Sequence, residues 1–421
     1  MPITNNRLNT SGIKAYRLYD NHHETGHLQD LPHGKTVEER SMTRIYLIRH
    51  AEAEGNLYRR IHGQYDSLIT ENGYRQIKKL RERFEPIHID AVYSSDMFRT
   101  ITTARAIYEP KGLTLHTRKD LREVAMGVWE DHPFGEISRI DPERMKLFGR
   151  TSAQFSVEGG ETFQQVRERV TAALLDIAAM HPNQTVAVFS HGTSIRTALA
   201  MFMGLTVEEG HKLGHSDNTA VSLLEIENGF VKVVFADDNS HLPEEISTLA
   251  QQNWWKGKGA LDLNLWYRPL DLSNEEDRDA YGQARAEAWQ TIHGTLDRFD
   301  AASFLADAKA CQETAPQNLV FSMVDDHPVG ILQMDSGREE DAGHISFFYM
   351  NPQTRHQGLG VQMLGQAVSI ARPMGLKRLQ LLCAVNNKTA LRFYGRYGFQ
   401  KTGAVPGAFG TLCRMEKNIG Y

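Results

Sequence analysis

The sequence has few cysteines: the 421 residues contain three, Cys311, Cys383 and Cys413. Three widely spaced thiols do not make a disulfide framework and indicate a reducing compartment. All three lie in the last third of the chain, so a thiol nucleophile is excluded for the first half.

Long apolar runs and dense basic runs are also missing. No stretch is long enough to cross a bilayer, and no apolar leader of a signal peptide is present. The formal net charge is −5, and no Lys/Arg run is interleaved with aromatic residues, which argues against a nucleic-acid-binding stripe. We therefore expect a cytoplasmic protein whose partners are small molecules, with no nucleic acid and no membrane among them. The sequence does not determine the oligomeric state.

The length suits two or three domains. Between residues 239 and 262 the strand-and-helix rhythm gives way to a polar stretch that contains Trp254-Trp255-Lys256-Gly257-Lys258-Gly259, a composition typical of an exposed linker. We predict a polar N-terminal extension at 1–42, a first domain at 43–242, a linker at 243–262 and a second domain at 263–421.

The N-terminal extension holds a cluster of His22, His23, Glu24 and His27. A metal site is conceivable there, but the scarcity of hydrophobic residues favours a solvated tail.

Two apolar, strand-like runs each end abruptly at a histidine, in Leu47-Ile48-Arg49-His50 and in Val188-Phe189-Ser190-His191-Gly192. A third run, Ala91-Val92-Tyr93, leads into Ser94-Ser95-Asp96, which are typical helix-capping residues, and then to Arg99. Ligands of an open parallel sheet bind beyond the carboxyl ends of its strands, so these side chains are predicted to share one crevice. Two arginines and two histidines there suit a dianion such as phosphate.

His50 is the candidate nucleophile. A neutral imidazole can attack phosphorus when one ring nitrogen donates to a fixed acceptor and the other keeps its lone pair. The leaving alcohol also needs a proton. The segment from Asp120 to Glu130 offers Glu123 in an apolar setting, which favours the protonated form of a carboxyl group, so Glu123 is the predicted general acid.

The order of these residues resembles the histidine phosphatase superfamily, which includes the cofactor-dependent phosphoglycerate mutases. The resemblance covers residues 43 to about 242 and runs through Arg49 to Asn56, Arg60 to Gly63, Asp66, Thr70, Ser94-Ser95, Arg99, Thr103-Ala104, Leu121-Arg122-Glu123, Gly127, Trp129, Gly160-Glu161-Thr162, Ser190-His191-Gly192 and Asn218. It implies that His50 becomes a phosphohistidine. It also implies that Arg49, Arg99 and His191 clamp the phosphoryl group and that Glu123 protonates the leaving oxygen.

The same resemblance implies phosphate contacts from Asn56, Arg60 and His62 and requires neither a metal nor a cofactor. Two positions depart from the family pattern: Ala51 replaces the usual glycine after the first histidine, and His62 replaces a glutamine often found near the phosphate. Alanine costs little unless the backbone there needs a positive φ. His62 would make phosphate affinity more dependent on pH.

After the linker the sequence predicts a mixture of strands and helices. The expected strands are 263–270, 319–324, 329–334, 344–350 and 379–385, with a turn at 325–328, and the expected helices are 274–293, 301–310 and 361–371. Before the third helix lies the loop Arg355-His356-Gln357-Gly358-Leu359-Gly360. Its glycines leave consecutive N–H groups unobstructed at a helix N-terminus, which suits a pyrophosphate.

The run from Asn387 to Tyr394 and the later Gly398-Phe399 complete a pattern that resembles the GNAT family of acetyl-CoA-dependent N-acetyltransferases, over about residues 263 to 418. The resemblance implies that Arg355 to Gly360 hold the CoA pyrophosphate, that backbone amides near Phe348, Tyr349 and Met350 face the thioester carbonyl, and that Asn387 contacts the pantetheine arm.

Tyr394 matches the family's tyrosine that protonates the departing thiolate, and its alternative role is that of a core aromatic residue beside Phe393. The general base for the amine stays open. Asp341 and His344 lie near the relevant strand, and water could also serve.

These patterns predict an α/β fold: a three-layer, phosphoglycerate mutase-like domain with a mostly parallel sheet, followed by a GNAT α+β domain with a mixed, splayed sheet. We expect a bifunctional enzyme that hydrolyses a phosphate ester and acetylates an amine; the fusion alone motivates the hypothesis that both act on one metabolite. The alternatives are a mutase, a phosphatase regulated by a non-catalytic acetyl-CoA-binding domain, and a scaffold without activity. Neither substrate can be predicted, because specificity resides largely in insertions, here expected at 131–156 and 274–315.

Overall fold

The computed structural model describes residues 16–17, 41–252 and 263–421, and the predicted cluster of His22, His23, Glu24 and His27 lies outside them, as does Trp254 to Gly259. The chain forms two compact units. The first contains residues up to Ala51, Arg75–Val128 and Lys146–Gln251, and the second contains Glu52–Tyr74, Trp129–Met145 and the chain from Gln252. No helix in the described ranges combines the length and the apolar character needed to span a membrane.

The first unit is built on a seven-stranded sheet. Its strands are β1 (Tyr16–Arg17), β2 (Met42–Arg49), β3 (Ala91–Ser95), β4 (Leu115–Arg118), β5 (Thr185–Ser190), β6 (Val221–Glu227) and β7 (Phe230–Asp238). The order across the sheet is β1-β7-β6-β2-β5-β3-β4. The strands β2, β5, β3 and β4 run parallel to one another, whereas β6 and β7 are antiparallel additions.

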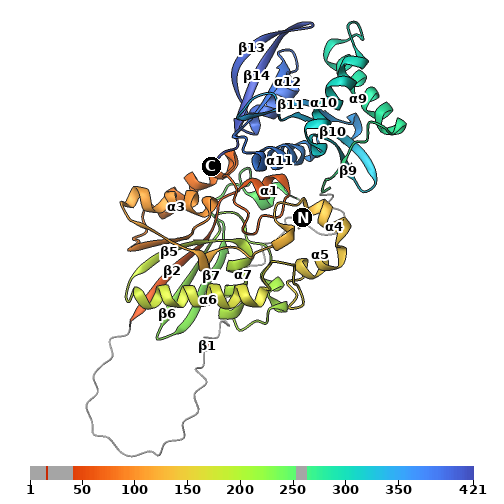
Figure 1. The fold of residues 1–421 in the computed structure, drawn as a ribbon. Helices are drawn as coiled ribbons and strands as arrows, with labels where there is room; N and C mark the ends of the chain where they lie inside the picture. Colours follow the sequence, from red (N-terminus) through yellow and green to blue (C-terminus); the bar gives the residue numbers. More distant parts are fainter. Residues whose placement is uncertain (1–15, 18–40, 253–262) are drawn as a thin grey trace, which may run out of the picture. The chain divides into compact units, whose positions relative to one another are not determined.

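Helices cover both faces of this sheet, with α3 on one side and α6 and α7 on the other (Figure 1). The helices of this unit are α3 (Phe98–Lys111), α6 (Phe163–Met180), α7 (Gly192–Phe202) and α8 (Thr248–Gln251), and α2 (Glu71–Phe84) and α5 (Pro142–Gly149) end in it. Coverage on two faces explains why β5 is a continuous apolar run, since Val186 to Phe189 are all 0% exposed. The predicted three-layer, mostly parallel architecture is confirmed.

The register of β2 with β5 brings the two strand ends together. Arg49 lies opposite Ser190, and the His50 amide donates to the Ser190 carbonyl at 3.0 Å. The capping prediction for the third strand end is wrong. The N-cap of α3 is Met97, without a side-chain hydrogen bond, because Ser95 is bonded to His191 and Asp96 pairs with Arg122 instead.

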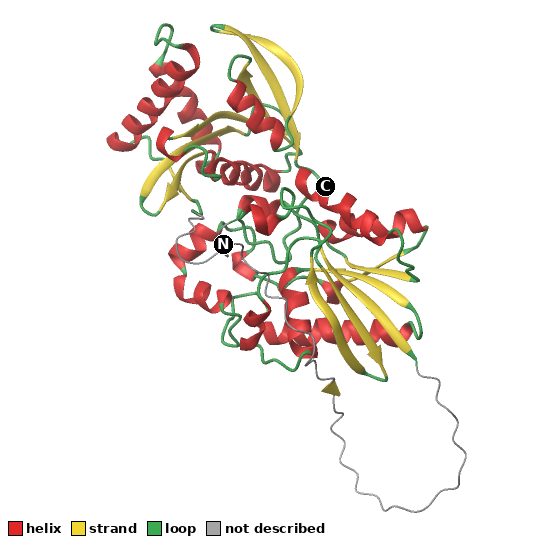
Figure 2. Ribbon diagram, turned by 180° about the vertical axis from the view of Figure 1, so that it is seen from behind, coloured by secondary structure: helices red, strands yellow, loops and turns green. Residues whose placement is uncertain are grey.

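The second unit has its own seven-stranded sheet. The strands are β8 (Trp266–Pro269), β9 (Leu319–Val324), β10 (His327–Asp335), β11 (Ala342–Met350), β12 (Arg378–Ala384), β13 (Gln400–Gly407) and β14 (Gly410–Asn418). The order is β13-β14-β12-β11-β10-β9-β8, and the only parallel pair among these is β11 with β12. Figure 2 shows the yellow strands between their covering helices. The predicted mixed sheet is confirmed.

Two helix pairs sandwich this second sheet. The helices of the unit are α1 (Glu54–Tyr58), α4 (Phe134–Ile140), α9 (Glu275–His293), α10 (Ala301–Thr314), α11 (Leu359–Ala371) and α12 (Lys388–Arg396). The core under α11 and α12 contains Leu332 and Ile345, and the core under α9 and α10 contains Ile331 and Phe347. Ile331 and Leu332, which are neighbours in β10, face opposite helix layers, as the alternation of a strand requires. Ile345 and Phe347 are two residues apart in β11 and still lie in opposite cores, because the pairing of β10 with β11 shifts register between them.

Several element boundaries differ from those predicted. The first strand begins at Trp266 rather than Leu263. The Gln362 side chain donates to the Leu263 carbonyl and accepts from the Leu265 amide, so these backbone groups do not pair with a strand. The expected turn at 325–328 shortens to Asp325-Asp326, and β10 already begins at His327. The hairpin of β13 and β14 was not predicted, since β13 is mostly exposed and lacks an apolar alternation.

The second unit also includes the short segments 52–74 and 129–145, which no sequence pattern had grouped with the residues after the linker. Tyr58 packs against α11 at Gly365, where a Cβ atom would lie 2.4 Å from the Tyr58 Cβ. A buried ion pair joins Glu54 to Arg372 at 2.9 Å. The predicted domain boundaries stay a prediction.

Candidate active sites

His50 follows directly after β2 and is 6% exposed. Its Nδ1 lies 2.7 Å from the Ala51 carbonyl oxygen, which can only accept, so Nδ1 carries the hydrogen and Nε2 keeps the lone pair. The His50 carbonyl in turn accepts from the Asn218 side chain at 2.9 Å. The backbone thus holds the imidazole in the tautomer that a nucleophile needs. Ala51 has no positive φ, so its departure from glycine causes no backbone strain.

His191 lies at the N-cap of α7 and is completely buried. Its ring centroid is 5.3 Å from that of His50, so the two predicted histidines do come together. Ser95 Oγ accepts from the Met97 amide and lies 2.9 Å from His191 Nε2, whereas the buried Nδ1 of His191 has no partner among the described residues. Burial lowers the pKa of His191 well below its usual value, and the charge of Arg99 lowers it further. His191 is therefore neutral at physiological pH.

Arg49 and Arg99 supply positive charge to the same unit. Arg49 Nη1 donates to the Ser216 carbonyl, whereas its buried Nε has no acceptor among the described residues. Gly192 makes room for this guanidinium, since a Cβ there would lie 3.2 Å from Arg49 Nε. Arg99, the second residue of α3, is 1% exposed. A buried guanidinium with a donor to spare, as in Arg49, suits an anionic ligand.

Glu123 lies at the N-terminus of α7, where its carboxylate accepts from the backbone amides of Thr193 and Ser194, each at 3.0 Å. The Ser194 hydroxyl and the Val124 amide also donate to it. The expectation of an apolar setting is wrong: backbone amides at the start of α7 and the Ser194 hydroxyl surround the carboxyl group, which makes this a polar site. The sequence could not indicate this, because the donors come from a helix about 70 residues later in the chain.

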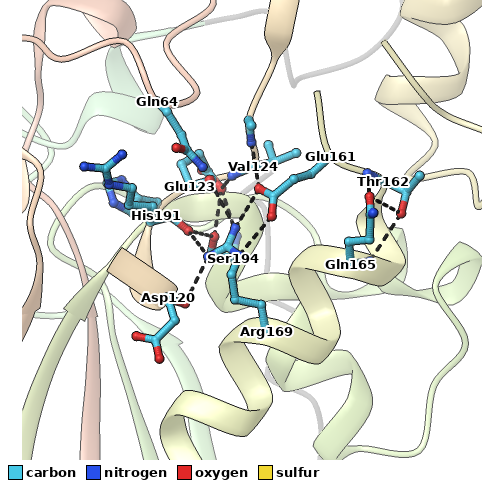
Figure 3. Close-up of polar contacts among 12 residues, drawn as sticks. Gln64, Asp120, Glu123, Val124, Glu161, Thr162, Gln165, Arg169, His191 and Ser194 are labelled. Atoms are coloured by element: carbon cyan, nitrogen blue, oxygen red, sulfur yellow. Dashed lines mark hydrogen bonds and ion pairs between the residues drawn. The ribbon is translucent and has the colours of Figure 1, made fainter. Parts of the chain in front are cut away.

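Arg169, which belongs to none of the motifs found in the sequence, positions the segment that carries Glu123. Figure 3 shows Arg169 reaching from α6 toward Glu161 and the backbone near Asp120. Its guanidinium binds both oxygens of Glu161, at 2.9 and 2.7 Å, and donates to the carbonyls of Asp120 and Arg122. Glu161 also accepts from the Ala125 amide, so the pair clamps the Glu123 loop from both sides. The only sequence signal was the motif Gly160-Glu161-Thr162.

Asn56, Arg60 and His62 belong to the second unit. The Asn56 side chain accepts from the Ala53 amide and closes the start of α1. The three guanidinium nitrogens of Arg60 donate within the unit to Asp131, Gln366 and Ser369. With a further bond from Nη2 to the Asp131 carbonyl, these contacts use four of the five N–H groups of Arg60. The predicted phosphate roles of all three residues stay predictions.

His62 Nε2 lies 3.0 Å from Asp131 Oδ1. Burial alone would raise the pKa of Asp131, but the hydrogen bond from His62 and the charge of Arg60 outweigh it and hold that pKa well below its usual value. Asp131 is therefore an anion that organises these side chains.

In the second sheet, the parallel strands β11 and β12 separate. Their pairing runs from Ala342 opposite Arg378 to Ile345 opposite Leu381 and stops there, although β11 continues to Met350. On its other edge β11 remains paired to β10 as far as Met350. The edge of residues 346–350 that faces β12 is therefore open to a ligand that can accept hydrogen bonds.

The loop at residues 355–360 leads from this open edge into α11. Gly358 is the N-cap, with a φ of 79°, and a Cβ atom added there would have nothing within 4 Å. Within the described part of the chain, the amides of His356, Gln357 and Gly358 donate to no protein group. Three unpaired amides at the N-terminus of a 13-residue helix fit a pyrophosphate.

Comparison with known proteins relates these two centres to two families. Residues 45–239 match the family model of the histidine phosphatase superfamily, branch 1. Phosphoserine phosphatase 1 of Hydrogenobacter thermophilus is 30% identical over 203 residues, which are 48% of this chain and 96% of that protein. The chain belongs to the histidine phosphatase superfamily.

Two further proteins similar to the histidine phosphatase domain carry other names. A probable phosphoglycerate mutase GpmB of Yersinia pestis is 32% identical over 172 residues, which are 41% of this chain and 80% of that protein. Among solved structures, Bacillus stearothermophilus YhfR is 29% identical, with a TM-score of 0.46, over 47% of this chain and 98% of that one.

Residues 275–399 match the model of the acetyltransferase (GNAT) family. The predicted fusion of a histidine phosphatase domain with a GNAT domain is thereby confirmed.

In the GNAT domain, Tyr394 is 7% exposed and lies beside the open edge, with its ring centroid 5.9 Å from that of Phe348. Burial raises the pKa of Tyr394, and nearby Cys383 adds to this, so the hydroxyl stays protonated. Asn387 caps α12 through its side-chain oxygen, which accepts from the Ala390 amide at 3.1 Å. Its Nδ2 is the group left for the predicted contact with pantetheine.

The two side chains considered as general base lie at the wrong end of the strand. Asp341 precedes β11 and pairs with Arg378 at 2.7 Å, and His344 is the third residue of β11. At about 3.3 Å per residue, His344 is roughly 20 Å from Met350 along the strand. Neither lies near the open edge at residues 346–350, and the general base stays open.

Proposed function

We propose that the chain is a bifunctional enzyme, which hydrolyses a phosphomonoester through a phosphohistidine and acetylates an amine with acetyl-CoA. The observation that carries the first activity is the hydrogen bond from His50 Nδ1 to the Ala51 carbonyl, which leaves Nε2 as a nucleophile beside a buried Arg49. Phosphoserine is the first substrate to test, because a relative that the chain covers almost entirely is named a phosphoserine phosphatase.

In the proposed hydrolysis, His50 Nε2 forms a bond to phosphorus while the bond from phosphorus to the ester oxygen breaks. The unpaired nitrogens Arg49 Nε and His191 Nδ1 support the phosphoryl oxygens in this step. Glu123 passes a proton to the leaving oxygen. Water then attacks the phosphohistidine, releases phosphate and restores His50.

The test is phosphate release from p-nitrophenyl phosphate and from O-phosphoserine without added metal, with the intact chain and with His50→Ala. We expect turnover that disappears in His50→Ala, and a phosphorylated intact chain that is labile in acid, as a phosphohistidine is. Transfer of phosphate between positions of a phosphoglycerate, with little phosphate released, would replace hydrolysis by mutase activity. No phosphorylation of His50 by any ester would overturn the proposal.

For the second activity, the open edge of β11 and the three unpaired amides at 356–358 fit acetyl-CoA. When bound, acetyl-CoA supplies the acetyl group. The amides of 356–358 would hold the pyrophosphate, and the edge amides of residues 348–350 would polarise the thioester carbonyl. The amine nitrogen bonds to the carbonyl carbon, the carbon–sulfur bond breaks, Tyr394 protonates the sulfur, and the amine loses a proton to water.

Thiol release from acetyl-CoA in the presence of an amine panel tests this activity. We expect amine-dependent release that Tyr394→Phe lowers about 10- to 100-fold in kcat. Binding of CoA without transfer to any amine, together with a changed phosphatase rate, would instead indicate an acetyl-CoA sensor.

A further inference from the structure

The two faces of the open part of β11 are chemically different. Phe348 packs with Phe393 and Tyr394 on the side of α11 and α12, where the residues proposed to hold acetyl-CoA lie. Phe347 faces the opposite side, under α9 and α10. The residues proposed to hold acetyl-CoA thus lie on one face of β11, and α9 and α10 lie on the other.

Arg285 on α9 lies on this second face, against Phe347. Its guanidinium carbon is 3.9 Å from the centre of the Phe347 ring and 4.7 Å from that of Phe304. Nε donates to the Tyr281 hydroxyl at 2.8 Å, and Nη2 donates to Gln333 Oε1 at 2.6 Å. Two neutral partners and two aromatic rings thus hold the cation in a fixed position next to the strand.

No carboxylate of the described residues forms an ion pair with Arg285. Glu287, two residues later, is engaged by Arg355, whose Nη2 lies 3.2 Å from both carboxylate oxygens. Burial lowers the pKa of Arg285; the negative charge of Asp307 on α10 acts in the opposite direction, but the two side chains form no ion pair. Nη1 of Arg285 has no hydrogen-bond partner in the described ranges, and it is not enclosed by protein.

Because Nη1 of Arg285 is not enclosed by protein, it is the group of this cation that an anion can reach. The arrangement differs from that of Arg268 in the same unit, which forms a two-bond pair with Asp277. Aromatic faces and neutral acceptors orient Arg285 but leave its charge uncompensated.

We propose that Arg285 binds a carboxylate of the acceptor, so that the substrate acetylated by the GNAT domain is an amino acid or a close analogue with both an amine and an acid group. The proposal rests on the acetyl transfer proposed above. Arg285 falls within residues 274–315, where specificity was expected to reside. It acts as a specificity-determining residue, and the reaction itself takes place at the neighbouring strand edge.

The experiment compares amino acids with their carboxamides, which keep the amine and lose the negative charge. With the intact chain we expect kcat/KM to be higher for the acids. Arg285→Gln should lower kcat/KM for the acids roughly 10- to 100-fold, mainly through KM, the loss expected for a charge-assisted hydrogen bond. The carboxamides should change by less than about twofold. Arg278→Gln, on the same helix with a single long bond to the Leu272 carbonyl, is the matched control.

Equal losses for acids and carboxamides in Arg285→Gln, or a preference of the intact chain for amines without an acid group, would overturn the proposal. A structural role predicts such equal losses, and a thermal melt of each variant identifies a folding defect. Arg285→Lys is the second variant: it keeps the charge and should retain part of the preference for acids.

Calorimetry separates this proposal from the acetyl transfer on which it depends. Amino acids are titrated into the intact chain saturated with CoA, which lacks an acetyl group to transfer. Binding that weakens in Arg285→Gln supports the carboxylate contact even if no transfer is detected. No binding of any amino acid, with CoA bound, overturns the contact; transfer to other amines would then leave the acetyltransferase activity standing.

Discussion

The histidine phosphatase centre and the GNAT centre use different chemical groups. The first is assembled from side chains at strand ends: His50, His191, Arg49 and Glu123 each bring a charge or a ring nitrogen. The second is assembled mainly from backbone, namely the open edge of β11 and the amides of residues 356–358.

This difference decides how each centre responds to change. A side-chain centre loses a whole chemical function when one residue is replaced. A backbone centre keeps its N–H groups in almost any variant, so it fails only when the space around those groups is filled or the strands close. Substitutions should therefore act through kcat in the phosphatase and through ligand affinity in the GNAT loop.

The largest effect that tests the comparison is expected for Glu123→Gln. An amide can replace the hydrogen-bond acceptor of Glu123 but cannot pass on a proton, so kcat for O-phosphoserine should fall roughly 100- to 10,000-fold. Hydrolysis of p-nitrophenyl phosphate should fall much less, because nitrophenolate leaves without a proton. Phosphate release from both esters measures the contrast.

Glu158→Gln, an exposed carboxylate in the same domain, is the matched control for that variant. Equal losses on the two esters would remove the general-acid role from Glu123 and leave it as a residue that orders the start of α7.

Gly360→Ala should have an intermediate effect on the backbone centre. The new Cβ atom would lie 3.2 Å from the Phe393 ring, so the ring or the start of α11 has to move. We expect KM for acetyl-CoA to rise about tenfold, which corresponds to about 1.4 kcal/mol, with phosphatase activity unchanged.

The matched control is Gly282→Ala within α9, where nothing lies within 4 Å of the added Cβ. If Gly360→Ala lowered kcat and left KM for acetyl-CoA unchanged, the loop would not be a binding element, and the comparison would fail on the GNAT side.

The last prediction concerns the stability of the fold, through protonation behind His50. His241 accepts from Arg83 at Nδ1, 3.1 Å away, and its Nε2 is 3.1 Å from the hydroxyl of Thr219, whose amide donates to the His50 carbonyl. Burial lowers the pKa of His241, and the positive charge of Arg83 lowers it further, from 6.5 to about 4. The unfolded chain therefore binds more protons between these values, and stability falls as the pH falls from 6.5 toward 4.

The free energy of unfolding should decrease by about 2 kcal/mol between pH 7 and 4.5 because of this residue. His241→Gln keeps one acceptor and one donor without titrating, so its unfolding curves in urea should show a weaker dependence on pH. An unchanged dependence would mean that His241 is protonated in the folded chain without cost.

Much of the fold could be predicted because local patterns carry it. Helix α9 begins after Asn274, whose side chain caps it, and ends at Gly294 in the left-handed conformation, both of which are local signals. The strand ends at His50 and His191 could be predicted in the same way, since an apolar run that stops at a polar motif is a local feature. The β13–β14 hairpin was not, because its exposed residues alternate too little to mark a strand.

The sequence by itself determined the two families and the identity of the residues whose side chains can take part in the chemistry, because both depend on side-chain type and order. Only the tertiary structure decided that Glu123 lies against the amides of α7, that Arg169 clamps its loop, that β11 and β12 part after Ile345, and that Arg285 lacks a carboxylate partner among the described residues. Each of these depends on groups dozens of residues apart along the chain, on backbone atoms common to every residue, or on the absence of a neighbour. A linear sequence specifies such relations only through folding.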